Sequence, residues 1–514
     1  MARRAGPLAP AVLALALVLL ALVLAPLIAV AVRGAGLSLD RADWAAVRFT
    51  LVQAMLSALL ATLLAVPVAR ALARRSFPGR GVLIAVMGAP FLLPAVVAVL
   101  GLLAVFGRAG WLNDALGAFG VAPLSIYGLA GVLMAHVFLN LPLAVRMILH
   151  GWQAIPAERF RLARSLGFGP REIHRHLERP MLREVLPGVV LIILVICLGS
   201  FAVVLTLGGG PAATTIELAI YQAVRFDFDL ARAAGLAVVQ VGICAAVAIL
   251  AWSVTRHAGF GTGLGRAVPV PAPAGWRRAG DALAIGLAAL FLALPLLAVL
   301  LRGVPGLTQL APEVLPAAGR SLMVALASAA LATSAALALA LAAARRPSLL
   351  LEGAATLPLA TSGLALGTGL FLLVQPFASP MSLALPVTVL VNVALSLPFL
   401  YRILLPEARA LQRDYGRLAD SLGLAGWARL RRLVLPRLGR PLGFGAGLAA
   451  ALAMGDLGVI ALFAGEQQAT LPLVVQHLAA AYRTEAAAAA ALILVGLSLA
   501  LFWVCDAGGR HAAA

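Results

Sequence analysis

Two nearly identical polar segments are the first residues of this sequence whose spacing indicates a function. RLARSLG occupies 161–167 and RLADSLG occupies 417–423, 256 positions apart. Each segment mixes Arg with Leu and Ala and ends at a Gly, which is typical of a short amphipathic helix followed by a helix stop. A helix this short, tethered at both ends, has too little surface to be stable alone. The pair therefore predicts two surfaces that dock a partner.

Residues that could bind a metal or carry out catalysis are scarce. His174 and His176 form an HxH pair, but the neighbouring Arg side chains would repel a metal ion. Cys197, Cys244 and Cys505 lie far apart inside apolar segments, as packing residues do. The chain contains no HExxH motif, no GxSxG motif and no pair of carboxylates inside the apolar segments. We therefore expect no metal site, no bound cofactor and no enzymatic activity in this chain.

The composition sets the environment in which these residues lie. The chain has 514 residues, of which 63% are hydrophobic and 11% are charged, and its mean hydropathy is +1.03. A bilayer core of about 30 Å requires roughly 20 apolar residues in a helix, and many segments reach that length. The apolar segments are continuous rather than alternating, which excludes a transmembrane β-barrel. The sequence predicts an all-α polytopic membrane protein.

The apolar segments fall into two sets of six, joined by a polar linker. The linker, 256–280, is rich in Pro, Gly and Ala, and it separates a first domain at 1–255 from a second at 281–514. The N-terminal segment resembles a signal peptide but is too long for one, so we expect an uncleaved first helix. The predicted spans are 8–32, 47–72, 82–106, 126–149, 185–209 and 231–254, then 281–301, 320–344, 353–375, 383–405, 441–464 and 486–505.

The distribution of arginine predicts the orientation of these spans. All 39 basic residues are Arg, and they concentrate in alternate loops, above all in the first repeat loop (150–184) and the second repeat loop (406–440). By the positive-inside rule these loops and both termini lie in the cytoplasm. Charge divided among short loops does not form a nucleic-acid interface, so we expect no nucleic-acid partner. Without Lys the chain has no Walker A motif, and any ATP hydrolysis must come from another subunit.

The two sets of spans are copies of each other in the same orientation. SALLAT at 57–62 matches SAALAT at 328–333 with an offset of 271. From Leu141-Pro142 and Leu397-Pro398 onward, through both repeat loops, the offset is a constant 256. An even number of spans in each half makes the halves parallel repeats about an axis normal to the membrane. Loops normally diverge faster than helices, so a repeat that includes the loop indicates a retained use.

Several acidic residues are candidate sites on or near the spans. Asp456 lies in the middle of a span, where a carboxylate costs several kcal/mol, order of magnitude, unless it lines a wet cavity or is paired. With Ser200, its counterpart in the first half, it either lines a translocation path or makes a hydrogen bond between helices. Glu217, Asp227 and Asp229 fall in a predicted outward loop at 210–230. They are candidate contacts for a periplasmic partner, or only the solvated face of the loop.

The repeat loops resemble the EAA loop of ABC importer permeases, with three residues, a Gly four positions later and an apolar-x-apolar-Pro ending. Both copies have Arg where the family usually has Glu, and Glu158 and Asp414, one turn earlier, are candidates to supply the acid instead. The resemblance implies that the following residues dock an ATPase: Glu158, Arg161, Leu162, Ala163, Gly167, Leu177 and Pro180 in the first loop, and Asp414, Arg417, Leu418, Ala419, Gly423, Leu433, Leu435 and Pro436 in the second.

The resemblance covers essentially the whole chain and implies the fold and partners of a type I ABC importer permease in the bacterial inner membrane. It implies two cytoplasmic ATPase subunits that use ATP and a periplasmic solute-binding protein. TLGGGPAATTIELAIYQA at 206–223, followed by FDFDLARAA, and MGDLGVIALF at 454–463 resemble the permease of thiamine and thiamine pyrophosphate importers. Ferric-iron importer permeases share the fused plan, so iron is the alternative substrate.

Two other functional classes remain as alternatives. An ion-coupled secondary transporter predicts coupling acids or broken helices repeated in both halves, whereas Asp456 has no acidic twin. An integral membrane enzyme predicts His, Asp or Glu converging from several spans, and the spans are poor in these residues.

Overall fold

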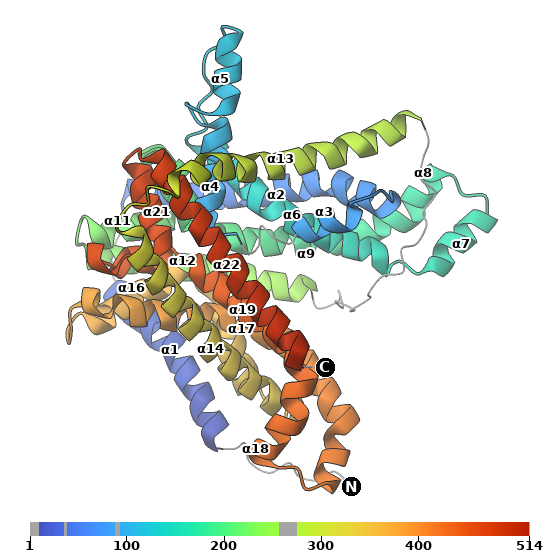
Figure 1. The fold of residues 1–514 in the computed structure, drawn as a ribbon. Coiled ribbons are helices and arrows are strands. Elements are labelled where there is room, and N and C mark those ends of the chain that lie inside the picture. The colour runs from blue at the N-terminus through green and yellow to red at the C-terminus, as the bar shows by residue number, and fades with distance from the viewer. Residues whose placement is uncertain (1–9, 35–38, 88–92, 256–274, 513–514) are drawn as a thin grey trace. The chain divides into compact units, whose positions relative to one another are not determined.

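The computed structural model describes residues 10–34, 39–87, 93–255 and 275–512, and every regular element in these ranges is a helix (Figure 1). The chain divides into two compact units. The first unit comprises Trp44–Thr215 and Ala246–Arg302, and the second comprises Met1–Asp43, Ile216–Ala245 and Gly303–Ala514. Most of the predicted linker, 256–280, lies outside the described residues, so the predicted domain boundaries stay a prediction.

The first unit alternates long helices with short ones. Its helices are α2 (Arg41–Arg74), α3 (Arg80–Val86), α4 (Ala95–Phe106), α5 (Trp111–Ala118), α6 (Leu129–Ala154), α7 (Ala157–Ser165), α8 (Pro170–Ile173), a π-helix (His174–Glu178), α9 (Arg179–Leu198), α10 (Phe201–Leu207), a 3-10 turn (Pro211–Ala213) and α13 (Trp276–Gly306). Helix α12 (Leu230–Thr255) begins in the second unit and ends in the first.

The second unit has a similar order of elements. Its helices are α1 (Pro10–Gly34), α11 (Ile216–Arg225), α14 (Val314–Arg345), α15 (Leu349–Thr356) with a 3-10 turn (Leu357–Ala360), α16 (Gly363–Val374), a 3-10 turn (Pro380–Leu383), α17 (Ala384–Ser421), α18 (Gly426–Arg429), a π-helix (Leu430–Val434), α19 (Leu435–Met454), α20 (Gly458–Phe463), a 3-10 turn (Glu466–Gln468), α21 (Leu471–Ala480) and α22 (Thr484–Ala512).

The predicted all-α polytopic fold is confirmed. Eleven helices among the described residues are long and apolar enough to cross a membrane, or twelve if the bent pair Leu349–Ala360 and Gly363–Val374 forms one span. That pair bends by 103°, so a straight span at 353–375 was wrong. The break follows from local chemistry, because the Ser362 hydroxyl accepts the backbone N–H of Ala365 at 3.2 Å and starts a new helix there.

Two further breaks and two additional helices depart from the predicted spans and loops. The fifth span of each half is interrupted, at Gly199–Ser200 in the first half and between Met454 and Gly458 in the second. The predicted loops 210–230 and 465–485 each contain a helix, α11 and α21. Part of the predicted span 82–106 falls on residues 88–92, outside the described residues.

The first helix of each half of the sequence packs in the compact unit that consists mainly of the other half. Helix α1 packs on α14, α15, α16 and α17 in the second unit, and Figure 1 shows it beside α14 and α16. Its Pro26 carbonyl approaches Gly369 so closely that a Cβ at 369 would collide with it. In the first unit, a Cβ at Gly101 would lie 2.6 Å from the Pro295 carbonyl oxygen of α13. The compact units therefore do not coincide with the two halves of the sequence.

We expect Gly369→Ala to destabilise the protein, because the new methyl group meets the backbone of α1 rather than a flexible side chain. Overpacking of this kind costs about 1–3 kcal/mol. The melting temperature of the purified protein in detergent measures the effect. Gly353→Ala, in α15 with nothing within 4 Å of the new Cβ, is the matched control and should leave the melting temperature unchanged or higher. Equal melting temperatures for the two variants would contradict the close packing of α1.

Candidate functional site

The two repeat loops end their first helix in the same way. Gly167 and Gly423 adopt positive φ values of 69° and 64°, the left-handed conformation that favours glycine. The backbone N–H of the next residue then bonds five residues back, from Phe168 to Ala163 and from Leu424 to Ala419, each at 2.9 Å. This is the Schellman closure of a helix C-terminus. The predicted helix stops are confirmed in both loops.

The loops differ in how this helix begins. In the first loop Ile155 is extended, with ψ 120°, before Pro156, and α7 is separate from α6. In the second loop the predicted short helix at 417–423 is not separate: its residues up to Ser421 form the end of α17, which runs for 38 residues without interruption. At 1.5 Å per residue α17 is about 57 Å long, far beyond the roughly 30 Å of a bilayer core. Its last turns therefore extend out of the hydrocarbon.

Each repeat loop presents leucines to solvent at equivalent positions. Leu162 and Leu166 are 59% and 61% exposed, and Leu418 and Leu422 are 55% and 64% exposed. We call these four residues the loop leucines. They lie four residues apart, on one face of each helix, while Ala163 and Ala419, about 100° further round each helix, are buried. Each loop thus exposes a pair of apolar side chains outside the bilayer, and the two pairs occupy equivalent positions of the repeat. Such a surface is suited to binding a partner protein.

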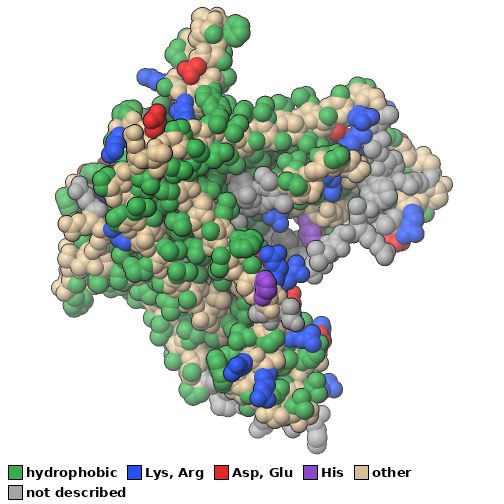
Figure 2. Space-filling view, in the orientation of Figure 1, with side chains coloured by type: hydrophobic (Ala, Val, Ile, Leu, Met, Phe, Trp, Pro, Cys, Tyr) green, Lys and Arg blue, Asp and Glu red, His purple; other side chains and the backbone are tan. Residues whose placement is uncertain are grey.

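The charged residues of the loops lie mainly at the surface. Arg161 donates to Glu158 at 2.8 Å, and both side chains are 73% exposed. Asp414 pairs at 2.9 Å with its neighbour Arg413 rather than with Arg417. Exposed pairs of this kind contribute little to stability, so these charges are free to interact with another protein. Figure 2 shows arginine side chains gathered over α18 and the end of α17.

A π-helix follows in both loops at corresponding positions. It spans His174–Glu178 in the first and Leu430–Val434 in the second, just before Pro180 and Pro436. A proline has no N–H to donate to the carbonyl four residues back, and a wider turn relieves this defect. The N–H groups of Arg179 and Leu435 accordingly bond five residues back, to the carbonyls of His174 and Leu430. π-helical turns are rare and concentrate at functional sites, so their duplication strengthens the case for the loops.

The residues that close each loop behave alike. Leu177 and Leu433 are half-buried, while Pro180 is exposed and Pro436 half-buried. Leu435, which begins α19, is also half-buried. These residues lie at the base of each loop rather than on the face of the loop leucines.

Different side chains hold the two loops in place. In the first loop the buried carboxylate of Glu178 binds Arg70 at 2.7 Å, Arg74 at 2.5 Å and His174 at 2.9 Å, which joins the loop to the end of α2. In the second loop Val434 occupies the equivalent position. Sequence reasoning missed Glu178, because a residue without a counterpart in the repeat gives no periodic signal.

The second loop is held by an internal set of contacts. Arg429 is 8% exposed and donates to Asp420 at 2.8 Å and to Gln412 at 2.9 Å. The guanidinium of Arg437 lies 4.6 Å from the centre of the Tyr415 ring. The two loops therefore keep the same helix stop and the same π-helix with unrelated supports, which indicates that this shape is the retained property.

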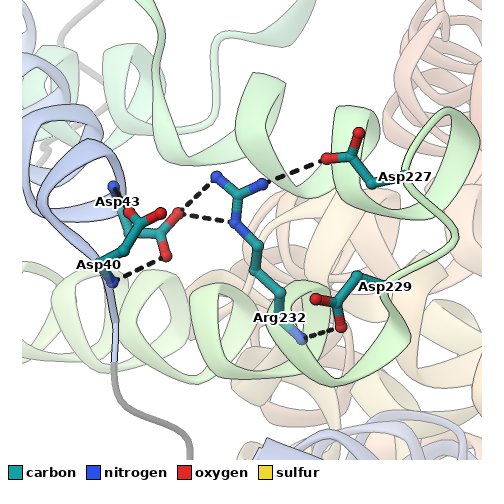
Figure 3. A network of polar contacts seen from close by, with 5 residues as sticks. All are labelled: Asp40, Asp43, Asp227, Asp229 and Arg232. Carbon is teal, nitrogen blue, oxygen red and sulfur yellow. Dashed lines mark hydrogen bonds and ion pairs between the residues drawn. The ribbon is translucent and has the colours of Figure 1, made fainter.

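Asp227 and Asp229 belong to a network at the start of α2 and α12 (Figure 3). Arg232 binds the buried carboxylate of Asp43 at 2.8 Å and reaches Asp227 at 3.2 Å. Asp229 accepts the backbone N–H of Arg232 at 2.9 Å and caps α12. The two candidate contacts therefore also organise helix ends.

A capping box at the start of α2 completes this network. The N–H of Asp43 donates to Asp40 at 2.7 Å, and the N–H of Asp40 donates to Asp43 at 3.2 Å. The Asp43 N–H holds the pKa of the exposed Asp40 carboxyl below its usual value. The sequence contains the Asp-x-x-Asp spacing that could have predicted this cap.

Glu217 lies elsewhere than predicted. It is on α11 rather than in an outward loop, and only 2% of the residue is exposed. Burial raises the pKa of its carboxyl to about 7, and the charge of Asp456 acts in the same direction. A solvated loop face at Glu217 was therefore wrong.

Asp456 and Ser200 occupy the breaks in the fifth spans, and each has a polar neighbour at an equivalent position. Ser200 shares a 2.6 Å hydrogen bond with His136, whose other ring nitrogen contacts Ser57 at 2.9 Å. In the second half Asn392, 256 positions after His136, faces Asp456. Sequence reasoning missed His136 and Asn392, although the constant offset of the repeat could have paired them.

Replacing Glu178 with Gln should release the first loop from α2, because Arg74 would be left buried without a counter-ion. We expect a loss of about 2–3 kcal/mol, less than for a fully buried pair because Arg70 is a third exposed. Trypsin cleavage at the arginines of the loop should become faster. Glu158→Gln removes an exposed pair and is the control. If both variants were cleaved at the wild-type rate, the anchoring role of Glu178 would be refuted.

Comparison with known proteins places these features in a family. No family model matches the chain. The thiamine transport system permease protein ThiP of Brucella abortus (strain 2308) is 38% identical over 500 residues, covering 93% of this chain and 91% of the relative. ThiP of Salmonella typhimurium is 40% identical over 484 residues, covering 91% and 90%. ThiP of Escherichia coli (strain K12) is 39% identical over 477 residues, covering 90% and 88%.

A more distant relative matches part of the chain. The sulfate transport system permease protein CysW of Synechocystis is 28% identical over 211 residues, or 41% of this chain. The ThiP relatives instead cover both halves with their repeat loops. Together with the helical polytopic fold, this similarity shows that the chain is an inner-membrane protein of the ThiP family of thiamine transport system permeases.

Proposed function

We propose that this chain is the membrane-spanning permease subunit of an ABC importer that carries thiamine and its phosphate esters inward. The observation that carries this proposal is the pair of repeat loops, which share a helix stop, a π-helix, a register and the exposed loop leucines. The names of the ThiP relatives support thiamine rather than ferric iron as the substrate.

The partners in this proposal follow from what the chain lacks and what it exposes. Without Lys it has no Walker A motif, so two copies of a cytoplasmic ATPase would supply the energy and bind one repeat loop each. The chain itself would bind no cofactor and catalyse no reaction. A periplasmic binding protein would deliver the solute, with Asp227 and Asp229 as candidate contacts. The Arg-rich loops support a topology with both termini in the cytoplasm.

The energy of nucleotide binding would reach the membrane through the loops. Closure of the ATPase dimer would move both docked loops, and each loop is continuous with a span through α9 or α17. The halves would then alternate between inward-open and outward-open states. For this to occur, nucleotide must bind more tightly to one state than to the other.

The docking role can be tested at the loop leucines. Leu162→Asn together with Leu418→Asn should weaken binding of the ATPase by roughly 30-fold, since loss of an apolar anchor costs about 2 kcal/mol. Co-purification and titration of the ATPase onto the permease in nanodiscs measure this. Leu349→Asn, at an 88% exposed leucine outside both loops, is the control. Wild-type ATPase affinity in the double variant would overturn the docking role.

The substrate can be tested by uptake. Cells that lack other thiamine transport should accumulate radiolabelled thiamine only when this chain is produced with its ATPase and binding protein. Excess unlabelled thiamine should compete, and excess ferric ion should not. Cells that produce the Leu162→Asn, Leu418→Asn permease are the control, because this variant should insert into the membrane without coupling to the ATPase. Uptake that is the same with and without this chain would refute the thiamine assignment and leave the docking result intact.

A further inference from the structure

A group of polar side chains converges inside the second unit at the break between α19 and α20. Asp456 lies at this break, and the backbone N–H groups of Gly458, Val459 and Ile460 lie against its carboxylate and fix its position. The residue remains partly exposed. Asp456 therefore holds the break, and part of the residue is exposed there.

Glu217 approaches the same place from α11. Helix α11 packs against α16 and α20, and the Ser362 hydroxyl at the start of α16 hydrogen-bonds to the Glu217 carboxyl. Asn392 faces Asp456 from α17, which also packs on α20. Four helices thus bring two carboxyls, one amide and one hydroxyl to one place.

Several of these groups lack a hydrogen-bond partner. Glu217 Oε1, Asp456 Oδ2 and Asn392 Nδ2 are inaccessible to solvent and unpaired. Glu217 and Asn392 are only 2% and 5% exposed. Unpaired polar atoms inside a membrane protein cost free energy, and they are retained where a ligand supplies the missing hydrogen bond or ion pair.

The charge of this place is unbalanced. Among the described residues, the groups that interact most strongly with the two carboxyls are Ser362, Asn392, Cys244, backbone N–H groups and the acids themselves, and none of these is basic. Two neighbouring buried carboxyls cannot both ionise without a counter-ion. A cation between them would allow both to be charged.

At the corresponding break in the first unit, the described residue is Ser200 rather than an acid. Ser200 and His136, the counterparts of Asp456 and Asn392, hydrogen-bond to each other, and the second ring nitrogen of His136 contacts Ser57. Helix α21, the sequence counterpart of α11, also lies in the second unit and contains no acidic residue. The carboxyl pair, with Glu217 from the first half of the sequence and Asp456 from the second, is therefore not repeated by the duplicated fold among the described residues.

We propose that Glu217 and Asp456, together with Ser362 and Asn392, form a binding site for an organic monocation as it crosses the permease. The site rests on the proposed function, in which the positively charged heterocyclic ring of thiamine is that cation. The ring would enter at the exposed side of Asp456 and pair with that carboxylate. The buried carboxyl of Glu217 would form the second ion pair with the ring.

The test uses two variants that remove charge and keep shape. In Asp456→Asn the side-chain oxygen still accepts the N–H groups of α20, and in Glu217→Gln the amide still bonds Ser362. The complete complex is reconstituted in proteoliposomes with saturating thiamine-loaded binding protein. Uptake of labelled thiamine and ATP hydrolysis are measured together. Glu313→Gln removes a half-exposed acid of the second unit and is the matched control.

Both variants should lower thiamine uptake per ATP hydrolysed about tenfold, the scale of one charge-assisted hydrogen bond, with ATPase stimulation unchanged. The exchange variant Asn392→Asp, Asp456→Asn should recover uptake, because it returns a carboxylate to the site. Wild-type coupling in both variants would overturn the site while the import function stands. An equal loss of uptake and ATPase activity, a structural effect, would also overturn it. Absence of thiamine uptake by the wild-type complex would overturn the import function and this site together.

Discussion

The architecture depends on how the chain satisfies backbone hydrogen bonds where helices are interrupted inside a membrane. Hydrocarbon offers no water, so each break needs a side chain or an adjacent backbone group to replace the lost partner. At Ser362 a hydroxyl accepts the N–H of Ala365, and at Asp456 a carboxylate faces three N–H groups. Ser200, Ser362 and Asp456 all lie at such breaks. The need to close a break thus places reactive side chains inside an otherwise apolar bundle.

The repeat loops have kept the same helix stop and π-helix although the side-chain contacts that support them differ between the two copies. Gly167 and Gly423 keep the same turn, and both loops continue into a π-helix. Glu178 anchors the first loop through a buried ion pair, whereas Arg429 supports the second through Asp420 and Gln412. A partner that contacts both loops would select for their surface and backbone. The supporting residues underneath are then free to diverge.

Much of the fold could be predicted from the sequence, because span length, arginine placement and the constant offset each report a strong physical constraint. The helix stops at Gly167 and Gly423 were predictable for the same reason. The bend before Ser362 was not, since its residues are as apolar as those of a straight span. Glu217 was misplaced because a short helix between two spans has the polarity of a loop. Its burial results from packing against α16 and α20, which no local pattern encodes.

The exchange of α1 and α13 has a consequence for biosynthesis. Helix α1 is made first, but its packing partners α14 to α17 lie some hundreds of residues later in the chain. At a synthesis rate of about 5–20 residues per second, α1 must wait in the lipid for tens of seconds before these partners emerge. The first unit is likewise incomplete until α13 has been inserted. Neither unit can mature during translation of its own half, so the polypeptide completes its tertiary structure only late, as a whole.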